Sequence, residues 1–193
     1  MTLVTRYHPA LVVLHWAMAL LIIAALALGA LVMVKIPNID PMKIEALRSH
    51  MFGGAAILVL MLTRLAIRIR SAHPAPASAG HPLLDWLGWV SHRLFYTLVI
   101  AMAGSGIVMA VQFGLFDIVL FGHGRVPADF WVLPIRGVHY ALSRILMALI
   151  ALHIVAALYH AFVLRDGLLG RMFFGRRTIG AATPARIEPK VQP

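Results

Sequence analysis

The sequence predicts an all-α integral membrane protein built as a four-helix bundle. Hydrophobic residues make up 61% of the 193 residues and charged residues only 12%, which excludes an ordinary soluble domain. Each of four apolar stretches is long enough to cross roughly 30 Å of hydrocarbon as a helix. Together they use most of the chain, so we expect one compact bundle and no separate soluble domain. The stretches cover about residues 10–34, 50–67, 94–113 and 137–164.

Residues at the ends of these stretches predict where the helices begin. The first apolar stretch is about twice as long as the core of a signal peptide and contains His15, so we expect a permanent helix. Asp40 and Pro41 are typical of a helix start, and Pro134 opens the last helix. The predicted helices are about 10–34, 41–70, 92–113 and 134–165, all in one domain over residues 1–177.

The connections carry their own signals. The stretch from Ser71 to Pro82 is rich in Pro, Ala and Ser, which predicts a loop before the third helix. Residues 114–133 mix aromatic residues with Gly and Pro, and we expect them to cover the bundle at the outer interface. Residues 178–193 contain several Pro and basic residues, so we expect a mobile basic tail that lies along the anionic inner leaflet.

The distribution of basic residues predicts the orientation. Lys and Arg number eleven in the segments on the side of the amino terminus and five in the segments on the opposite side. The positive-inside tendency therefore places both termini in the cytoplasm. We interpret the net charge of +10 as a signal of membrane orientation and expect no nucleic-acid partner. The absence of cysteine excludes disulfides, thiolate metal sites and covalent attachment of c-type haem.

Two histidines of the last predicted helix have a spacing that suits a membrane. His139 and His153 are fourteen residues apart, which corresponds to roughly 21 Å of helix and almost four full turns. Both side chains therefore lie on nearly the same face, one in the outer and one in the inner half of the bilayer. Histidines inside a membrane are costly unless they face the bundle and have a partner or a ligand.

Two further histidines match these depths. His15 lies a few residues into the first helix, on the inner half, and His50 lies nine residues after Pro41, on the outer half. The depths pair His15 with His153 and His50 with His139. Two opposed imidazoles are the axial ligands of a six-coordinate haem, so the sequence predicts two haems b. A single intramembrane histidine more often forms a hydrogen bond, but four at matched depths favour haem, and no buried acid supports a di-metal site.

Other residues are weaker candidates. His160 could bind a quinone or carry its proton, or it could be interfacial. An interfacial position is favoured for His92, which could otherwise line the same pocket. Arg144 cannot comfortably face lipid and is expected to meet a haem propionate. Gly53 and Gly54, one turn after His50, would let a porphyrin face approach, although helix packing is the favoured explanation for these two residues taken alone. At the outer site, Arg48, Arg136 and Lys43 could neutralise haem propionates or attract an anion, or they could be solvated loop charges. At the inner site, Arg64 could meet the propionates or anchor its helix in the headgroups.

The same residues carry a family resemblance that spans about Tyr7 to Arg177. The chain resembles the bacterial cytochrome b-561 family, and within it most resembles the superoxide oxidase branch. The motifs that carry the resemblance are Leu14-His15-Trp16, His50 before Ile57-Leu58-Val59-Leu60-Met61 and Arg64, Gly106-Ile107-Val108-Met109, and the series His139, His153 and His160.

The resemblance implies a function as well as a fold. It implies that His15, His50, His139 and His153 are the haem ligands, in agreement with the depth argument, and that His160 lies near the quinone. It also implies that superoxide is oxidised at the periplasmic face of a bacterial inner membrane, with electrons passing through two haems to ubiquinone at the cytoplasmic side.

Two other classes of protein remain open at this stage. A cytochrome b subunit that anchors a hydrogenase or another dehydrogenase and relays its electrons to quinone would share the fold, but it would need partner chains. A haem-free membrane scaffold or transporter would show no b-type absorption band on reduction.

Overall fold

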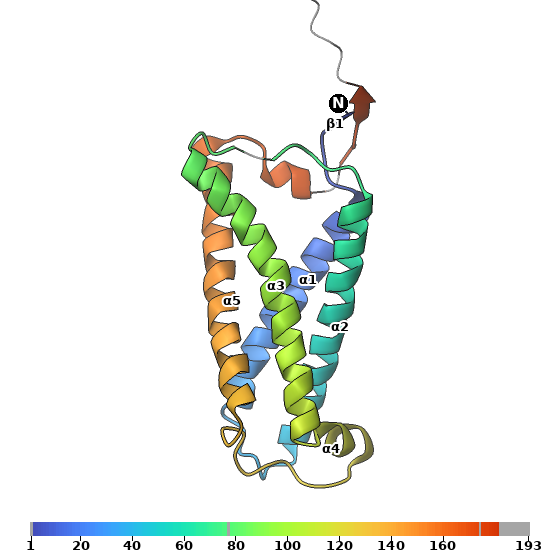
Figure 1. Cartoon of the computed structure of the whole chain (residues 1–193), viewed down its shortest axis with the longest axis vertical. Coiled ribbons are helices and arrows are strands. Elements are labelled where there is room, and N and C mark those ends of the chain that lie inside the picture. The colour runs from blue at the N-terminus through green and yellow to red at the C-terminus, as the bar shows by residue number, and fades with distance from the viewer. Residues whose placement is uncertain (1, 77, 174, 182–193) are drawn as a thin grey trace, which may run out of the picture.

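Four long helices form the body of the protein in a computed structural model that describes residues 2–76, 78–173 and 175–181 (Figure 1). This confirms the predicted helical bundle. The elements in chain order are β1 (Thr2–Val4), α1 (Pro9–Ala27), the π-helical segment η1 (Leu28–Met33), α2 (Met42–Arg70), α3 (Pro82–Gln112), α4 (Leu115–Phe121), α5 (Pro134–Tyr159), the π-helical segment η2 (His160–Leu164), the 3-10 segment η3 (Leu169–Met172) and β2 (Ile179–Ala181).

Four helical spans of the described residues are long and apolar enough to cross a membrane. They have 25, 29, 31 and 31 residues, and α1 and α5 reach these lengths together with η1 and η2. Large apolar side chains cover their outer surfaces; Leu20 and Phe162 are each 71% exposed. Such an apolar exterior suits lipid rather than water.

The third helix begins at Pro82, so the predicted start at residue 92 is wrong. The early start has a local cause. Pro82 occupies the first turn, where its missing N–H costs nothing, and the His81 side chain accepts a hydrogen bond from the Leu83 N–H. Asp85 then accepts from the Ala79 N–H at 2.6 Å and from the Ser78 hydroxyl at 2.7 Å. These polar contacts extend the helix beyond its apolar stretch.

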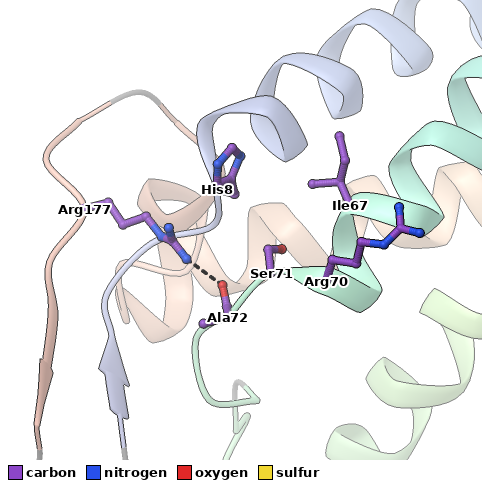
Figure 2. A pocket seen from close by; sticks show the side chains of 6 residues that line it. All are labelled: His8, Ile67, Arg70, Ser71, Ala72 and Arg177. Atoms are coloured by element: carbon purple, nitrogen blue, oxygen red, sulfur yellow. Dashed lines mark hydrogen bonds between the residues drawn. The ribbon is translucent and has the colours of Figure 1, made fainter.

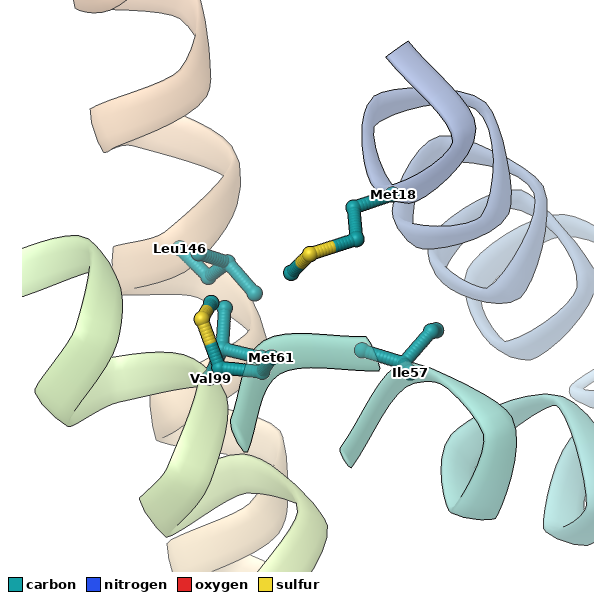
Figure 3. Close-up of a cluster of buried hydrophobic side chains, with 5 residues drawn as sticks. All are labelled: Met18, Ile57, Met61, Val99 and Leu146. Atoms are coloured by element: carbon teal, nitrogen blue, oxygen red, sulfur yellow. The ribbon is translucent and has the colours of Figure 1, made fainter. Parts of the chain in front are cut away.

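The middle of the bundle is a compact apolar layer to which all four long helices contribute. Figure 3 shows its five buried side chains converging between the helices. In lipid such a layer is held by close packing, because lipid tails are as apolar as the side chains. Leu146 lies seven residues from both His139 and His153, so the layer falls midway between the two predicted histidine levels. Its members are Met18 of α1, Ile57 and Met61 of α2, Val99 of α3 and Leu146 of α5.

A short helix covers one end of the bundle, which we call the loop end. Helix α4 runs between Gly114 and Gly122, whose φ angles of 61° and 71° lie in the left-handed region that glycine tolerates. Three of its side chains are buried in a second apolar cluster with Leu47 of α2 and Ala110 of α3. The segment from residue 114 to 133 therefore closes this end of the bundle, as Figure 1 shows.

The opposite end, which we call the terminal end, brings both ends of the described chain together. Strands β1 and β2 pair antiparallel, a feature that the sequence analysis did not predict. The Arg6 guanidinium donates to the carbonyls of Gly170 at 2.5 Å and Phe173 at 3.2 Å, and Trp16 Nε1 donates to the Met172 carbonyl at 2.9 Å. Of the predicted mobile tail, residues 179–181 form β2, and residues 182–193 lie outside the described part of the chain.

Candidate functional site

The four predicted histidines form two facing pairs. The ring centres of His15 on α1 and His153 on α5 are 6.4 Å apart, with an angle of 70° between the rings. The ring centres of His50 on α2 and His139 on α5 are 6.2 Å apart, with an angle of 74°. The first pair lies toward the terminal end and the second toward the loop end. The pairing is the one that helix depth predicts.

The separation of each pair fits a metal atom between two imidazoles. With metal–nitrogen bonds of about 2.0 Å and about 1.2 Å from nitrogen to ring centre, two trans imidazoles have centres about 6.4 Å apart. Among the described residues, no group of three or more His, Cys, Asp or Glu side chains could hold a metal ion. Two axial imidazoles without further protein ligands suit a metal that brings its own equatorial donors, as haem iron does.

A serine sets the tautomer of one ligand candidate. The hydroxyl of Ser105, a buried residue of α3, donates to the Met102 carbonyl at 2.8 Å and lies 2.9 Å from Nδ1 of His139. Because a serine hydroxyl has a single hydrogen, Ser105 Oγ must accept from the Nδ1–H of His139. The other nitrogen, Nε2, then keeps a free lone pair, which is the form of histidine that binds a metal.

The partner imidazole lacks such a support. His50 Nδ1 is buried and forms no hydrogen bond of normal geometry within the described residues, although the Ala25 carbonyl is close to it. Buried polar atoms are normally satisfied, so an orphan of this kind points to a ligand or to an adjustment on ligand binding.

Glycines leave room around the loop-end pair. A Cβ at Gly29 would lie 3.4 Å from Cε1 of His50, and one at Gly106 would lie 3.4 Å from Cε1 of His139. A Cβ at Gly53 or Gly54, which follow His50 by about one turn, would meet no atom within 4 Å. Close packing against another helix therefore does not require these two glycines, and the open space beside α2 is compatible with a flat ring system.

Further side chains crowd the terminal-end pair. The His92 ring lies 5.9 Å from that of His153 at an angle of 90°, and Nδ1 of His92 donates to the Gly88 carbonyl at 2.6 Å. Arg64 donates to the carbonyl of Leu11 and lies close enough to His15 to interact with it electrostatically. The structure thus brings two predicted candidates, His92 and Arg64, to this pair.

His160 has an acidic partner that the sequence analysis missed. Its Nδ1 lies 2.5 Å from Oδ2 of Asp166, whose Oδ1 accepts from the Leu168 N–H at 2.9 Å. The hydrogen bond from His160 lowers the pKa of Asp166 below its usual value, and the hydrogen bond from the Leu168 N–H lowers it further by a smaller amount. The two side chains are 15% and 29% exposed, so the pair is reachable at the terminal end. The sequence signal that could have predicted this pair was a carboxylate, Asp166, six residues after a histidine near the end of the last helix.

Two loop-end cations hold backbone carbonyls instead of facing outward. Lys43 is 6% exposed, and its Nζ donates to the carbonyls of Met33 at 2.7 Å and Ile36 at 2.8 Å. Arg48 donates twice to the Val119 carbonyl, at 3.1 and 2.9 Å, and pairs with Glu45 at 2.6 Å. These bonds fix η1 and α4 to α2, so the structure gives both cations a structural role that the sequence analysis did not expect.

The other two outer arginines lie against aromatic rings. The guanidinium of Arg136 is 4.6 Å from the ring centre of Trp131, and Arg136 remains close enough to the loop-end pair to interact with both imidazoles. Arg144 is exposed and lies 4.8 Å over Tyr140. Five residues after His139, it is about 140° around the helix, so it lies on a different face of α5 from the two histidines, and its contact with a haem propionate stays a prediction.

Comparisons with known proteins identify the family of the chain. The family model described as prokaryotic cytochrome b561 matches residues 6–175. The chain is 28% identical over 181 residues to a protein of Yersinia pestis named probable superoxide oxidase CybB, covering 89% of this chain and 98% of that protein. It is 26% identical over 175 residues to cytochrome b561 homolog 2 of Escherichia coli K12, covering 86% and 90%. The chain therefore belongs to the prokaryotic cytochrome b561 family of haem b-binding membrane proteins that transfer electrons.

Proposed function

We propose that this chain holds two haems b and transfers electrons from superoxide to ubiquinone. His15 and His153 would be the axial ligands of one haem, and His50 and His139 those of the other. The observation that carries the proposal is the presence of two imidazole pairs, 6.4 and 6.2 Å between ring centres, on either side of the central apolar layer. When bound, the haems supply reversible one-electron chemistry, and the chain fixes where it occurs.

The proposed orientation puts the terminal end in the cytoplasm and the loop end in the periplasm of a bacterial inner membrane. The excess of Lys and Arg at the terminal end supports it. In this orientation Arg6, Arg171 and Arg177, which donate to backbone carbonyls of the terminal end, lie at the level of anionic headgroups.

At the loop end, the residues act mainly through charge. Arg136 is the basic residue that interacts with both imidazoles of the loop-end pair, and Lys43 lies near Arg136. A positive potential at this position attracts a small anion and raises its arrival rate. Superoxide is such an anion, and the printed name of the Yersinia pestis relative supports it as the donor.

At the terminal end, the residues suit binding and protonation of a quinone. Reduction of a quinone to a quinol consumes two protons, and His160 would deliver one of them. Nδ1 of His160 pairs with Asp166, so Nε2 is the ring nitrogen that would face a quinone oxygen. His92, which contacts His153, would face the same quinone from α3.

Stopped-flow mixing of the purified oxidised protein with superoxide tests the donor. We expect rapid reduction of the b-type absorption bands, and reoxidation when ubiquinone is added. Arg136→Gln should slow the reduction at low ionic strength and lose most of its effect at high salt, because salt screens steering. Arg125→Gln, the same charge change in the loop after α4, is the matched control. Absence of reduction by superoxide would favour a subunit that takes electrons from a partner dehydrogenase.

Haem counting tests the ligands separately from the donor. We expect two haems b per chain by pyridine haemochrome assay, and one in either His153→Ala or His139→Ala. His123→Ala, which changes an exposed histidine after α4, should keep both. Loss of neither haem in the first two variants would contradict the ligand assignment.

A further inference from the structure

A cavity of about 380 Å³ lies at the terminal end of the bundle, away from the histidine pairs. It is formed where α1 begins, where α2 ends, and where Arg177 of the segment after η3 bonds to the Ala72 carbonyl. Figure 2 shows Arg177 and Arg70 on opposite sides of Ser71, with His8 and Ile67 above it in this view. The lining residues are His8, Ile67, Arg70, Ser71, Ala72 and Arg177.

The polar side chains of this cavity are all hydrogen-bond donors. Nδ1 of His8 accepts from the Ala10 N–H at 3.2 Å, so the remaining ring hydrogen of His8 is on Nε2. Arg177 uses two of its five N–H groups on the carbonyls of Arg6 and Ala72, at 3.1 and 2.6 Å, which fixes its guanidinium at the wall. Two guanidinium groups and an imidazole N–H, without any acidic lining residue, select for an oxyanion.

Ser71 adds an unsatisfied donor to this wall. Its hydroxyl oxygen is buried and has no hydrogen-bond partner among the described residues. Buried hydroxyl groups without a partner are costly, so this wall is incomplete without an acceptor. The serine is the first residue after α2, next to Arg70, whose guanidinium forms no hydrogen bond or ion pair within the described part of the chain.

The position of the cavity narrows the class of anion. It lies where two membrane-spanning helices end, and Ile67 gives it an apolar wall on the α2 side. The start of α1, which carries the partial positive charge of a helix amino terminus, is at the same place. Phosphate esters meet these conditions, because they bring several acceptor oxygens to a cationic, donor-lined site.

We propose that this cavity binds a phosphate group with a net negative charge, held by Arg70, Arg177, the Nε2–H of His8 and the hydroxyl of Ser71. Such a group can come from an anionic phospholipid headgroup or from a soluble phosphate compound. The site is separate from electron transfer, so the proposal does not depend on the identity of the donor or the acceptor.

Native mass spectrometry of the full haem-loaded protein tests the site. The protein is released from micelles that contain phosphatidylglycerol or the zwitterionic phosphatidylcholine, and retained lipids are counted. We expect each chain to retain one more lipid molecule from phosphatidylglycerol micelles than from phosphatidylcholine micelles. Arg70→Gln and Ser71→Ala should each weaken this retention about tenfold, since each removes one hydrogen bond to a charged group. Arg176→Gln, the same charge change at an exposed position outside the cavity, should not.

A second arm identifies the source of the phosphate. Inorganic phosphate is added at constant ionic strength, and unfolding is followed by tryptophan fluorescence. If the protein retains phosphatidylglycerol but phosphate does not stabilise it, the site is for a lipid. If phosphate stabilises the protein and both Arg70→Gln and Ser71→Ala abolish this effect, the site is for phosphate itself. Equal behaviour of the wild type and these two variants, or an equal loss in Arg176→Gln, would overturn the proposal.

Discussion

If each histidine pair holds a haem, as proposed, replacement of Ser105 by alanine should change the environment of the haem at the loop-end pair, called the loop-end haem, and leave the other haem unaltered. In the wild type, Ser105 Oγ accepts the Nδ1–H of His139 at 2.9 Å and donates to the Met102 carbonyl at 2.8 Å. Without the hydroxyl, this imidazole N–H is left without its acceptor in a buried position. A hydrogen bond at Nδ1 raises the basicity of the ligating nitrogen, and a more basic ligand stabilises oxidised iron. The variant should therefore raise the reduction potential of the loop-end haem.

The size of the shift follows from the energy of the lost bond. A typical buried hydrogen bond contributes about 0.5–1.5 kcal/mol. Since about 59 mV corresponds to a tenfold change for one electron, the expected upward shift is on the order of 20–60 mV. Loss of a partner of this kind also lowers metal-site affinity roughly 10–100-fold, so the haem should dissociate more readily.

Potentiometric titration of the b-type bands measures both haems in one experiment. Ser143→Ala is the matched control, because Ser143 of α5 makes the same bond to the carbonyl three residues earlier, at 2.7 Å, without contacting a histidine. Ser105→Thr keeps the hydroxyl and should restore the wild-type potential. An unchanged potential in Ser105→Ala, or an equal shift in Ser143→Ala, would refute the hydrogen-bonding scheme.

Three further predictions concern the His160–Asp166 pair, Gly106, and the bonds from Arg48 to α4. Because the pKa of Asp166 is lowered in the folded protein, its bond with His160 stabilises the fold at pH values above the unfolded pKa of about 3.9. This stabilisation is lost as the pH falls through the folded pKa. The Asp166→Asn variant should therefore melt at a lower temperature than the wild type at pH 7, and at the same temperature at low pH. Gly106→Val should displace the imidazole next to it and cost one haem by pyridine haemochrome assay, whereas Gly137→Val, which faces open space, should keep both. Arg48→Gln should speed amide hydrogen exchange in α4 by roughly tenfold or more, since two bonds to one carbonyl are lost; unchanged exchange would remove its anchoring role.

The membrane-spanning architecture was predictable because few alternatives satisfy a long apolar sequence. A backbone in hydrocarbon must pair its own polar groups, so each apolar stretch becomes a helix. The constant rise of a helix then converts residue number into depth, which is why His15 pairs with His153 and His50 with His139. The start of α3 was missed because its first turns are set by caps around Pro82, in a segment that is not continuously apolar.

The roles of the loop-end cations could not be read from the sequence. Lys43 and Arg48 bond to carbonyls of η1 and of α4, and the positions of these carbonyls depend on irregular backbone that has no periodic pattern. Ser105 was missed for a related reason. A serine in an apolar helix is usually satisfied by the carbonyl of the preceding turn, and only the tertiary structure brings His139 to its oxygen.

The apolar layer between the two histidine pairs has an electrical consequence. In the proposed orientation, an electron that passes from the level of His139 to that of His153 crosses roughly 21 of about 30 Å of hydrocarbon. It travels from the positive toward the negative side of an energised membrane, so each 100 mV of voltage opposes the transfer by about 1.6 kcal/mol. The reaction would then be electrogenic, and collapsing the voltage across sealed vesicles should accelerate it.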